Sequence, residues 1–417
     1  MSQGEQTDFS PIRVRRSFGA IVGAAPSPSH SYKSTASAVR SIADSIGLGS
    51  IVKRGDSVLL KVNMGCTGFR IPEGRYTSHP SYVAGIIECL KDCGARVMFG
   101  DDVSRAKRHV EKLWASTGMS DVAHRTGAQL VDPVAFGGRE VRGRLRYPRT
   151  HFVTNLLFDV DAVVNAANCR SLSDVVFSGA IKNMFGMVLG TRKARLHGMF
   201  PDIRDFSRVI VDVCHIARPA VSFLDLTSVI EGQGLADAIR EVGLMLGSAD
   251  PVAVDTVAAH AIGYEQLTVW TTVYGSAAGL GCNEMDRIDI RGLDWPDFPK
   301  KALRYPAPPR TGRGSLYDRL TRSLNHTILR PRPVIVQDRC TGCGDCSDRC
   351  PASAIAPLGR TFQVSQRACA DCGCCIRVCE HEAVRLEFTR VASSVRRVKA
   401  ALWWQATQGA RSGAGHQ

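Results

Sequence analysis

The sequence lacks the features that would assign it at once to a common class. No run approaches the roughly eighteen uninterrupted apolar residues that a membrane-spanning helix needs. The first residues carry two acidic side chains before any basic one, which is not the pattern of a secretory signal peptide. The motifs G-x-x-x-x-G-K-[ST], H-E-x-x-H and G-x-S-x-G are all absent. We therefore expect a cytoplasmic protein without a membrane span, and these motifs identify no reaction.

Cysteine is scarce over most of the chain and concentrated in one stretch. Of the 15 cysteines, nine fall between Cys340 and Cys379 inclusive, which leaves six for the rest of the 417 residues. Thiols stay reduced in the cytoplasm, so a cluster this dense indicates a metal before it indicates disulfides. The apolar fraction of 44% excludes wholesale disorder, and the formal charge is +14.

Short apolar runs alternate with helical periods from residue 51 to residue 294. Residues 57–63 and 96–102 have the composition of buried strands, whereas 79–95 and 248–263 have that of helices. This alternation predicts an α/β fold with a parallel, doubly wound sheet. The expected domains are a lead-in (1–50), the α/β domain (51–294), a Pro/Arg-rich linker with an amphipathic helix (295–332), a small α+β module (333–390) and a basic tail (391–417).

The cysteine cluster contains a tandem repeat. The pattern C-x2-C-x2-C-x3-C occurs twice, and each cysteine of the second run follows its counterpart at one constant offset, as Cys369 follows Cys340. The repeat resembles the bacterial-type two-cluster ferredoxins, in which the fourth cysteine of each run ligates the other [4Fe-4S] cluster. That resemblance implies two clusters, one held by Cys340, Cys343, Cys346 and Cys379 and the other by Cys369, Cys372, Cys375 and Cys350.

The second run departs from the first at two positions. Glu380 stands where the first run has Pro351, which would loosen the turn after Cys379, and Cys374 has no counterpart. We expect Cys374 to be a spectator, although it could substitute as a ligand. Zinc is the rival metal, because paired C-x2-C motifs also mark zinc ribbons. The crossed repeat of eight cysteines favours iron–sulfur clusters.

A second resemblance covers roughly residues 55–265. The segment Ser178-Gly-Ala-Ile-Lys-Asn-Met-Phe-Gly186, followed by Arg192 and His197, resembles the central signature of the family catalogued as domain of unknown function 362. Many members of that family carry a two-cluster ferredoxin module. Leu172 departs from the family pattern, which has a histidine there, so this chain lacks that imidazole. His151 and His197 are possible substitutes.

The polar residues of these motifs fall at predicted carboxyl ends of strands and amino ends of helices, where open α/β sheets bind ligands. Together they would form a cationic pocket for an anionic or carbonyl-bearing substrate. We expect Asp101, Asp102 and His79 to be solvated loop ends rather than ligands of a divalent ion. The candidate catalytic residues are Lys182, His197 and Asn183, and the candidate substrate-binding residues are Lys61, Asn63, Arg170, Arg192 and Asp250.

The favoured function is an iron–sulfur oxidoreductase that passes electrons through two [4Fe-4S] clusters to a small substrate or bound cofactor in the α/β domain. The alternative is a non-catalytic electron carrier or maturation factor whose α/β domain docks a partner. Basic segments such as 137–151 favour docking of an acidic electron-transfer protein, or a plain solvated surface, over binding of nucleic acid. No flavin motif is evident, and neither the direction of electron flow nor the oligomeric state follows from the sequence.

Overall fold

The computed structural model of the chain divides into two compact units, residues 1–309 and 310–417, and each is described by itself. None of the described helices is long and apolar enough to cross a membrane. All structural statements concern the residues that the structure describes, which are 19–64, 77–102, 107–146, 148–172, 175–190, 192–200, 202–231, 238–264, 268–295, 303, 332–348, 350, 353–369, 375–376 and 379–387.

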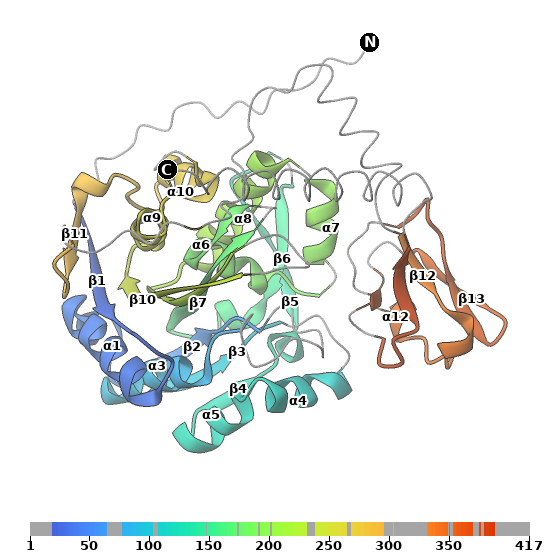
Figure 1. Ribbon diagram of the computed structural model, residues 1–417, viewed down its shortest axis with the longest axis horizontal. Coiled ribbons are helices and arrows are strands. Elements are labelled where there is room, and N and C mark those ends of the chain that lie inside the picture. The colour runs from blue at the N-terminus through green and yellow to red at the C-terminus, as the bar shows by residue number, and fades with distance from the viewer. Residues whose placement is uncertain are drawn as a thin grey trace, which may run out of the picture. The chain divides into compact units, whose positions relative to one another are not determined.

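A nine-stranded sheet forms the centre of the first unit (Figure 1). Its order is β11 (Ile288–Arg291), β1 (Ala20–Pro26), β10 (Ala238–Ser248), β9 (Val221–Glu231), β7 (Ala162–Leu172), β2 (Ser57–Lys61), β3 (Arg96–Gly100) and β4 (Gln129–Val131), with β8 (Val176–Ser178) paired to β7. The five strands from β9 to β4 are mutually parallel. Strand β10 is antiparallel to β9 and to β1. The connection from β9 to β10, residues 232–237, is too short for the crossover helix that a parallel pairing would need.

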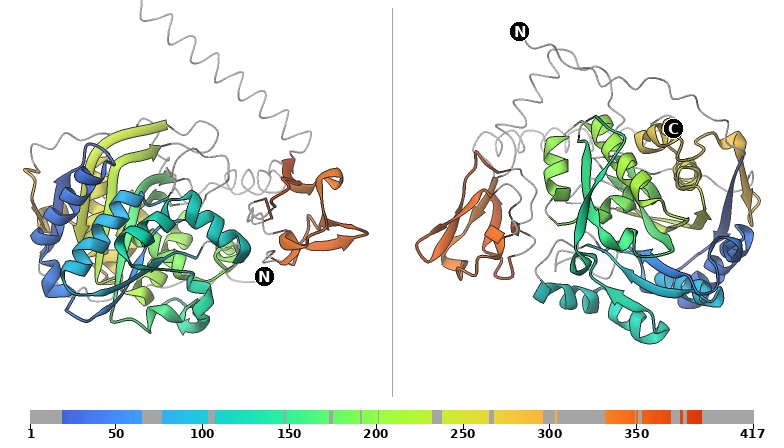
Figure 2. Two further views of the ribbon diagram at one scale, coloured as in Figure 1. Left: turned by 90° about the horizontal axis from the view of Figure 1, so that it is seen from below. Right: turned by 180° about the vertical axis from the view of Figure 1, so that it is seen from behind.

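Helices cover both faces of this sheet (Figures 1 and 2). Leu60 faces a buried cluster shared with α1 and α3, whereas its neighbour Leu59 faces a cluster shared with α6 and α8. This alternation confirms the predicted α/β class with a mostly parallel sheet. The first face holds α1 (Tyr32–Ser45), α2 (Leu48–Ile51), α3 (Pro80–Asp92), α4 (Lys107–Ser116) and α5 (Met119–Thr126), and the second α6 (Ala180–Asn183), α7 (Arg192–Met199), α8 (Ile203–Ala217), α9 (Pro251–Ala261) and α10 (Trp270–Ala277).

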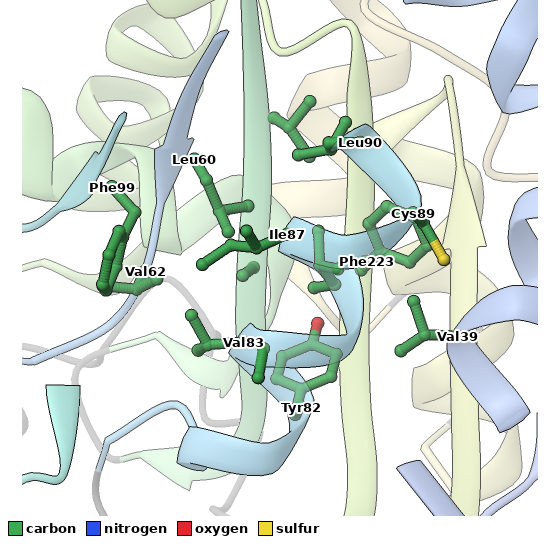
Figure 3. Close-up of a cluster of buried hydrophobic side chains, with 14 of the residues drawn as sticks. Val39, Leu60, Val62, Tyr82, Val83, Ile87, Cys89, Leu90, Phe99 and Phe223 are labelled. Carbon is green, nitrogen blue, oxygen red and sulfur yellow. The ribbon is translucent and has the colours of Figure 1, made fainter. Parts of the chain in front are cut away.

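Local sequence explains where the main helices begin. The Asp250 side chain accepts hydrogen bonds from the amides of Val252 and Ala253, and Pro251 occupies the first helical position of α9. His79 caps α3 in the same way, with Pro80 following it. Figure 3 shows how α3 then presents Tyr82, Val83 and Ile87 to the sheet.

In the second unit, the strands repeat along the sequence at the same interval as the cysteines. β12 (Arg332–Ile335) pairs with β15 (Val384–Glu387), and β13 (Ile355–Leu358) pairs with β14 (Thr361–Val364). β14 follows β12, and β15 follows β13, at the same offset that relates the two cysteine runs. The two halves of the unit therefore share one local structure, and the strands in Figure 2 are drawn in orange and red. The short helix α12 (Asp345–Asp348) contains the third cysteine, Cys346.

Several predicted features lie outside the described residues. They are the amphipathic linker helix at 315–329, the basic tail at 391–417, and both Cys372 and Cys374. A hairpin, β5 (Gly138–Arg142) and β6 (Thr150–Thr154), takes up most of the basic segment at 137–151.

Candidate functional site

Four cysteines of the second unit line a single pocket, and they are Cys340, Cys343, Cys346 and Cys379. Apolar side chains, including Ile335, Phe362 and Val384, form much of the remaining lining. A cubane cluster needs this arrangement, in which three thiolates from one loop and a fourth from the other run surround an open space. Nowhere in the described part of the chain do three His, Cys, Asp or Glu side chains converge closely enough to hold a single ion.

The pKa of a cysteine in this pocket indicates that the pocket favours a bound cation. Burial first, and then the neighbouring Cys340, Cys343 and Cys379, raise the pKa of the Cys346 thiol to about 11. Negative charge therefore accumulates there unfavourably until a cation compensates it. These four residues fit an iron–sulfur cluster, and they would hold it through their sulfur atoms.

Three of the four residues proposed for the second cluster are described. Cys375 is buried, and Cys350 and Cys369 are half-buried. The Ala354 amide donates to Cys350 Sγ at 3.1 Å, and at the equivalent place in the repeat the Ala383 amide donates to Cys379 Sγ at 3.2 Å. Such amide–sulfur bonds tune cluster potentials. The second also shows that Glu380 does not remove this contact after Cys379.

Reciprocal hydrogen bonds tie the two halves of the unit together. Gln337 Nε2 donates to the Phe362 carbonyl at 3.1 Å, and Gln366 Nε2 donates to the Pro333 carbonyl at 2.8 Å. The two glutamines are equivalent positions of the repeat, and so are the two carbonyls, so the sequence repeat has become a two-fold arrangement in space. This symmetry supports crossed ligation, because each half then presents its fourth cysteine to the other half.

In the first unit, the carboxyl end of β2 carries a fully buried lysine. Lys61 is 1% exposed, and its Nζ donates to the Val62 carbonyl at 2.6 Å and to Asn183 Oδ1 at 3.0 Å. It also lies 3.0 Å from Asp101 Oδ1. Burial lowers the pKa of Lys61, and the carboxylate of Asp101 opposes that shift. The structure thus joins two of the predicted residues, Lys61 and Asn183, in one buried cluster.

Helix α6 is held so that Asn183 meets this lysine. The buried carboxylate of Asp255 accepts the amides of Ala180 at 2.6 Å and Ile181 at 3.0 Å, and burial raises its pKa to about 7. Asn183 Nδ2 in turn donates to Asn165 Oδ1 on β7 at 2.8 Å. The α6 signature segment is therefore fixed by a carboxylate at its start and by amides at its end.

Asp101 and Asp102 are not solvated loop ends, and that expectation was wrong. They are 4% and 3% exposed, because each meets a lysine at the carboxyl end of β3. Asp102 Oδ2 accepts the Gly190 amide and lies 3.2 Å from Lys193 Nζ. Sequence reasoning missed Lys193, whose Nζ also donates to the carbonyl oxygens of Asp102 and Gly186.

The remaining predicted residues have varied positions. Arg170 is 7% exposed on β7, and Lys182 is half-buried on α6. On α7, Arg192 lies 3.8 Å over the ring of Phe152, and the exposed His197 packs 4.2 Å from the ring of Phe206. The carboxylate of Asp250 accepts three amides, those of Val252, Ala253 and Cys282, so it fixes the start of α9.

His151, one possible substitute for the missing family histidine, is paired with a buried aspartate inside the fold. It is 2% exposed, and its Nε2 lies 2.8 Å from Asp212 Oδ2. The same carboxylate accepts the Arg144 amide at 2.7 Å, which fastens the loop between β5 and β6 to α8. This pair is therefore buried within the fold.

A histidine–aspartate pair that sequence reasoning missed lies at the carboxyl edge of the sheet. His30 Nε2 is 2.7 Å from Asp225 Oδ2, and the His30 ring stacks on that of His79 with 4.4 Å between centroids. Burial first, and then the nearby His30, lower the pKa of His79 to about 4. His30 falls within the expected lead-in at 1–50, where no strand was predicted, so no sequence signal marked it as a site residue. Next to the pair, Asn63 Nδ2 donates to Asn168 Oδ1, joining another predicted residue to this edge.

Comparisons with known proteins agree with both resemblances. The model of a family described as domain of unknown function (DUF362) matches residues 58–260, and a model described as a 4Fe-4S dicluster domain matches residues 332–380. A thylakoid-associated protein of Synechocystis is 28% identical over 236 residues, which are 56% of this chain and 71% of that protein.

Two further matches are more limited. The B component of an ion-translocating oxidoreductase complex of Methanosarcina acetivorans is 36% identical over 47 residues, which are 11% of this chain and 18% of that component. The lactate racemase apoprotein of Thermoanaerobacterium thermosaccharolyticum aligns with a TM-score of 0.37 at 13% identity, covering 58% of this chain and 56% of that one. A TM-score this low carries no argument about ligand or reaction.

Proposed function

This chain carries a domain of the DUF362 family joined to a 4Fe-4S dicluster domain with an electron-transfer role, and from that premise we propose that it is an iron–sulfur oxidoreductase. Its substrate would be a small anionic or carbonyl-bearing molecule, or a bound cofactor, held at the carboxyl edge of the α/β sheet. We propose the crossed sets Cys340, Cys343, Cys346, Cys379 and Cys369, Cys372, Cys375, Cys350 as cluster ligands.

The observation that carries this proposal is the buried contact of Lys61 with Asp101 and Asn183 in the unit that is fused to the redox module. Burying a charged lysine is costly unless its position is used or fully compensated. Here the ammonium orients Asn183, and Lys182 on the same helix is half-buried and directly precedes it. We therefore propose Lys182 and Asn183 as the groups that meet the substrate, and Lys61 as a residue that positions them.

When bound, the two clusters would supply one electron each, and reduction of a carbonyl to an alcohol takes two electrons and two protons. The protein's own residues then bind and orient the substrate. Arg170 and Asn63 on adjacent strand ends supply hydrogen-bond donors for an anionic group. Arg192 and His197 on α7 remain proposed contacts that would need the substrate to extend toward that helix. An electron-transfer protein is the proposed partner, and the cytoplasm the proposed location.

Stopped-flow reoxidation tests the proposal. The complete chain, reduced with dithionite under anaerobic conditions, is mixed with 2-oxo acids, enoyl carboxylates or quinones while the cluster absorbance is followed. We expect one class to reoxidise the protein, and Lys182→Ala to slow that step by at least about 100-fold. Lys53→Ala, at an exposed lysine before β2, is the matched control and should leave the rate unchanged.

Two results would contradict the proposal. One is that none of the acceptor classes reoxidises the reduced protein. The other is that Lys182→Ala and Asn183→Ala both reoxidise at the rate of the unchanged chain. Either would favour an electron carrier or maturation factor whose α/β domain docks a partner.

A further inference from the structure

The His30–Asp225 pair belongs to a continuous polar group at the carboxyl edge of the sheet. Asn168 and Asp225 are register partners on the adjacent parallel strands β7 and β9, so their side chains lie on the same face. Earlier on β9, Phe223 on that face packs into the core between the sheet and α3, beside Tyr82 (Figure 3). The polar group therefore begins where this apolar core ends.

Backbone contacts link the other members of the group. The Asn63 amide donates to Ser78 Oγ at 2.9 Å, and the Ser78 amide returns a bond to the Asn63 carbonyl at 2.8 Å. Ser78 directly precedes His79, whose ring stacks on His30. The loop after β1, the end of β2, the start of α3 and strands β7 and β9 thus converge on one place.

The two members of the pair differ in access to solvent. The Asp225 side chain is 5% exposed, and its second oxygen accepts the Thr227 amide at 2.8 Å, so the carboxylate is fixed. The His30 side chain is 24% exposed. Its Nε2 is bonded to Asp225, whereas Nδ1 bonds to none of the described groups. One ring nitrogen is therefore oriented by a buried carboxylate while the other remains open, which is the arrangement of an acid–base histidine.

The same polar group contains a further hydrogen-bond donor, on Asn168, the register partner of Asp225. Asn168 is half-buried, and its Oδ1 accepts from Asn63. Its Nδ2 donates to none of the acceptors in the described part of the chain, so this nitrogen can bind an oxygen of a ligand. A carbonyl or carboxylate oxygen of a ligand could accept a hydrogen bond from the protonated Nδ1 of His30 and from Nδ2 of Asn168.

We propose that His30, oriented by Asp225, donates a proton to a small carbonyl-bearing carboxylate whose oxygens are bound by Asn168. The inference deepens the proposed function and rests on it. His30 passes its Nδ1 proton to the carbonyl oxygen and changes from imidazolium to neutral imidazole, while Asp225 stays ionised. The two electrons would be supplied by the reduced clusters, and the second proton comes from water, which also reprotonates the exposed ring.

The charged surroundings of His30 support this role. Its pKa is raised from the ordinary value, because the hydrogen bond and charge of Asp225, helped by Glu241 on β10, outweigh the largest single effect, which is burial. His79, the titratable group on α3, is neutral at physiological pH because burial and His30 lower its pKa to about 4. A stacked neutral ring adds no competing charge, so His30 alone carries the proton.

The test measures carbethoxylation of individual histidines by peptide mass spectrometry in the oxidised, cluster-loaded chain. The reagent attacks neutral imidazole, so the pH at which labelling is half-maximal reports the protonation of His30. We expect Asp225→Asn to lower this midpoint by about one to two units. Asp92→Asn, at an exposed carboxylate paired with Arg40, is the matched control and should not change it.

The second arm uses oxalate as the probe. At about four times its dissociation constant, oxalate should slow labelling of His30 about fivefold. Labelling of the exposed His124 on α5 should not change, and Asn168→Ala should abolish the protection without moving the midpoint. A purely structural His30 would show no protection.

The inference is overturned if oxalate leaves His30 labelling unchanged in the native chain, which needs no variant to fold. It is also overturned if Asp225→Asn leaves the midpoint in place. Neither arm requires electron transfer. Reoxidation without oxalate protection would therefore reject the role of His30 alone, and protection without reoxidation would reject the proposed reaction alone.

Discussion

The two units of this protein hold their functional groups in opposite ways. In the described part of the second unit, the buried core is small, and two of its five members are cysteines: Ile335, Cys346, Ile355, Cys375 and Val384. The α/β unit has three large apolar clusters and places its polar groups at their margins. A unit whose core consists partly of ligands depends on the bound group to fold, whereas a unit with its own core does not.

Removing iron from the complete protein should have the largest effect. We expect anaerobic chelation to abolish amide protection in β12 to β15, because the remaining apolar core is too small to offset the loss of chain entropy. Protection in β2 and α3 should not change. Hydrogen exchange followed by mass spectrometry makes the comparison, and equal loss of protection in both units would contradict it.

Cysteine variants should sharpen this difference within the second unit. If ligation is crossed, Cys343→Ser and Cys379→Ser affect the same cluster although the two residues belong to different runs of the repeat. Each variant should alter about half of the EPR intensity of the reduced clusters. The double variant should alter the same half, because both residues ligate one cluster. Cys350→Ser should alter the other half. The matched control is Cys93→Ala, a half-buried cysteine of the α/β unit.

An added methyl group at Gly186 should disturb the α/β site directly. A Cβ there would lie 2.7 Å from Lys61 Cε and 2.8 Å from Asp101 Oδ1, in a buried cluster with little room to adjust. We expect Gly186→Ala to lower the free energy of unfolding of this unit by about 1–3 kcal/mol in urea titrations. Gly49→Ala, where no atom lies within 4 Å, should be neutral or slightly stabilising. Equal effects of the two would show that the cluster has room.

Acid should weaken the α/β unit through His79. Its pKa is about 4 in the folded chain against an ordinary 6.5, so the unfolded chain binds more protons between these values. The free energy of unfolding therefore falls as the pH falls through that window. His79→Asn keeps a helix cap without a titrating ring, and it should retain about 1–2 kcal/mol at about pH 5 relative to the unchanged chain.

Urea titrations at about pH 7 and about pH 5, followed by the fluorescence of this unit, measure that difference. The variant should match the unchanged chain at the higher pH. An identical loss of stability in both proteins on acidification would mean that His79 is not the group responsible.

Sequence reasoning worked where the signal was local. The strand expected at 57–63 is β2 at 57–61, and the helix expected at 79–95 is α3 at 80–92, because hydrophobic period and capping residues act over a few positions. The antiparallel β10 was not predicted. Its direction depends on the short connection from β9 and on pairing with β1, a strand far earlier in the chain.

The contacts that sequence reasoning missed at the site join residues that are far apart in the sequence. Lys61 and Asn183 were both identified from motifs, yet their contact with Asp101 and the burial of this cluster became visible only in the fold. His151 was a possible substitute for the family histidine that Leu172 replaces, and the structure pairs it with Asp212 in the interior. A side chain's neighbours, rather than its type, decide whether it is free to act.

By itself, the sequence determined the cysteine pattern and its tandem repeat, because ligands two or three positions apart must share a loop whatever surrounds them. The tertiary structure alone decided which polar residues meet at the sheet edge. His30 and Asp225 are 195 positions apart, and Lys61 and Asn183 are 122 apart. Such pairs are created by strand order and register, which arise from packing of the whole sheet.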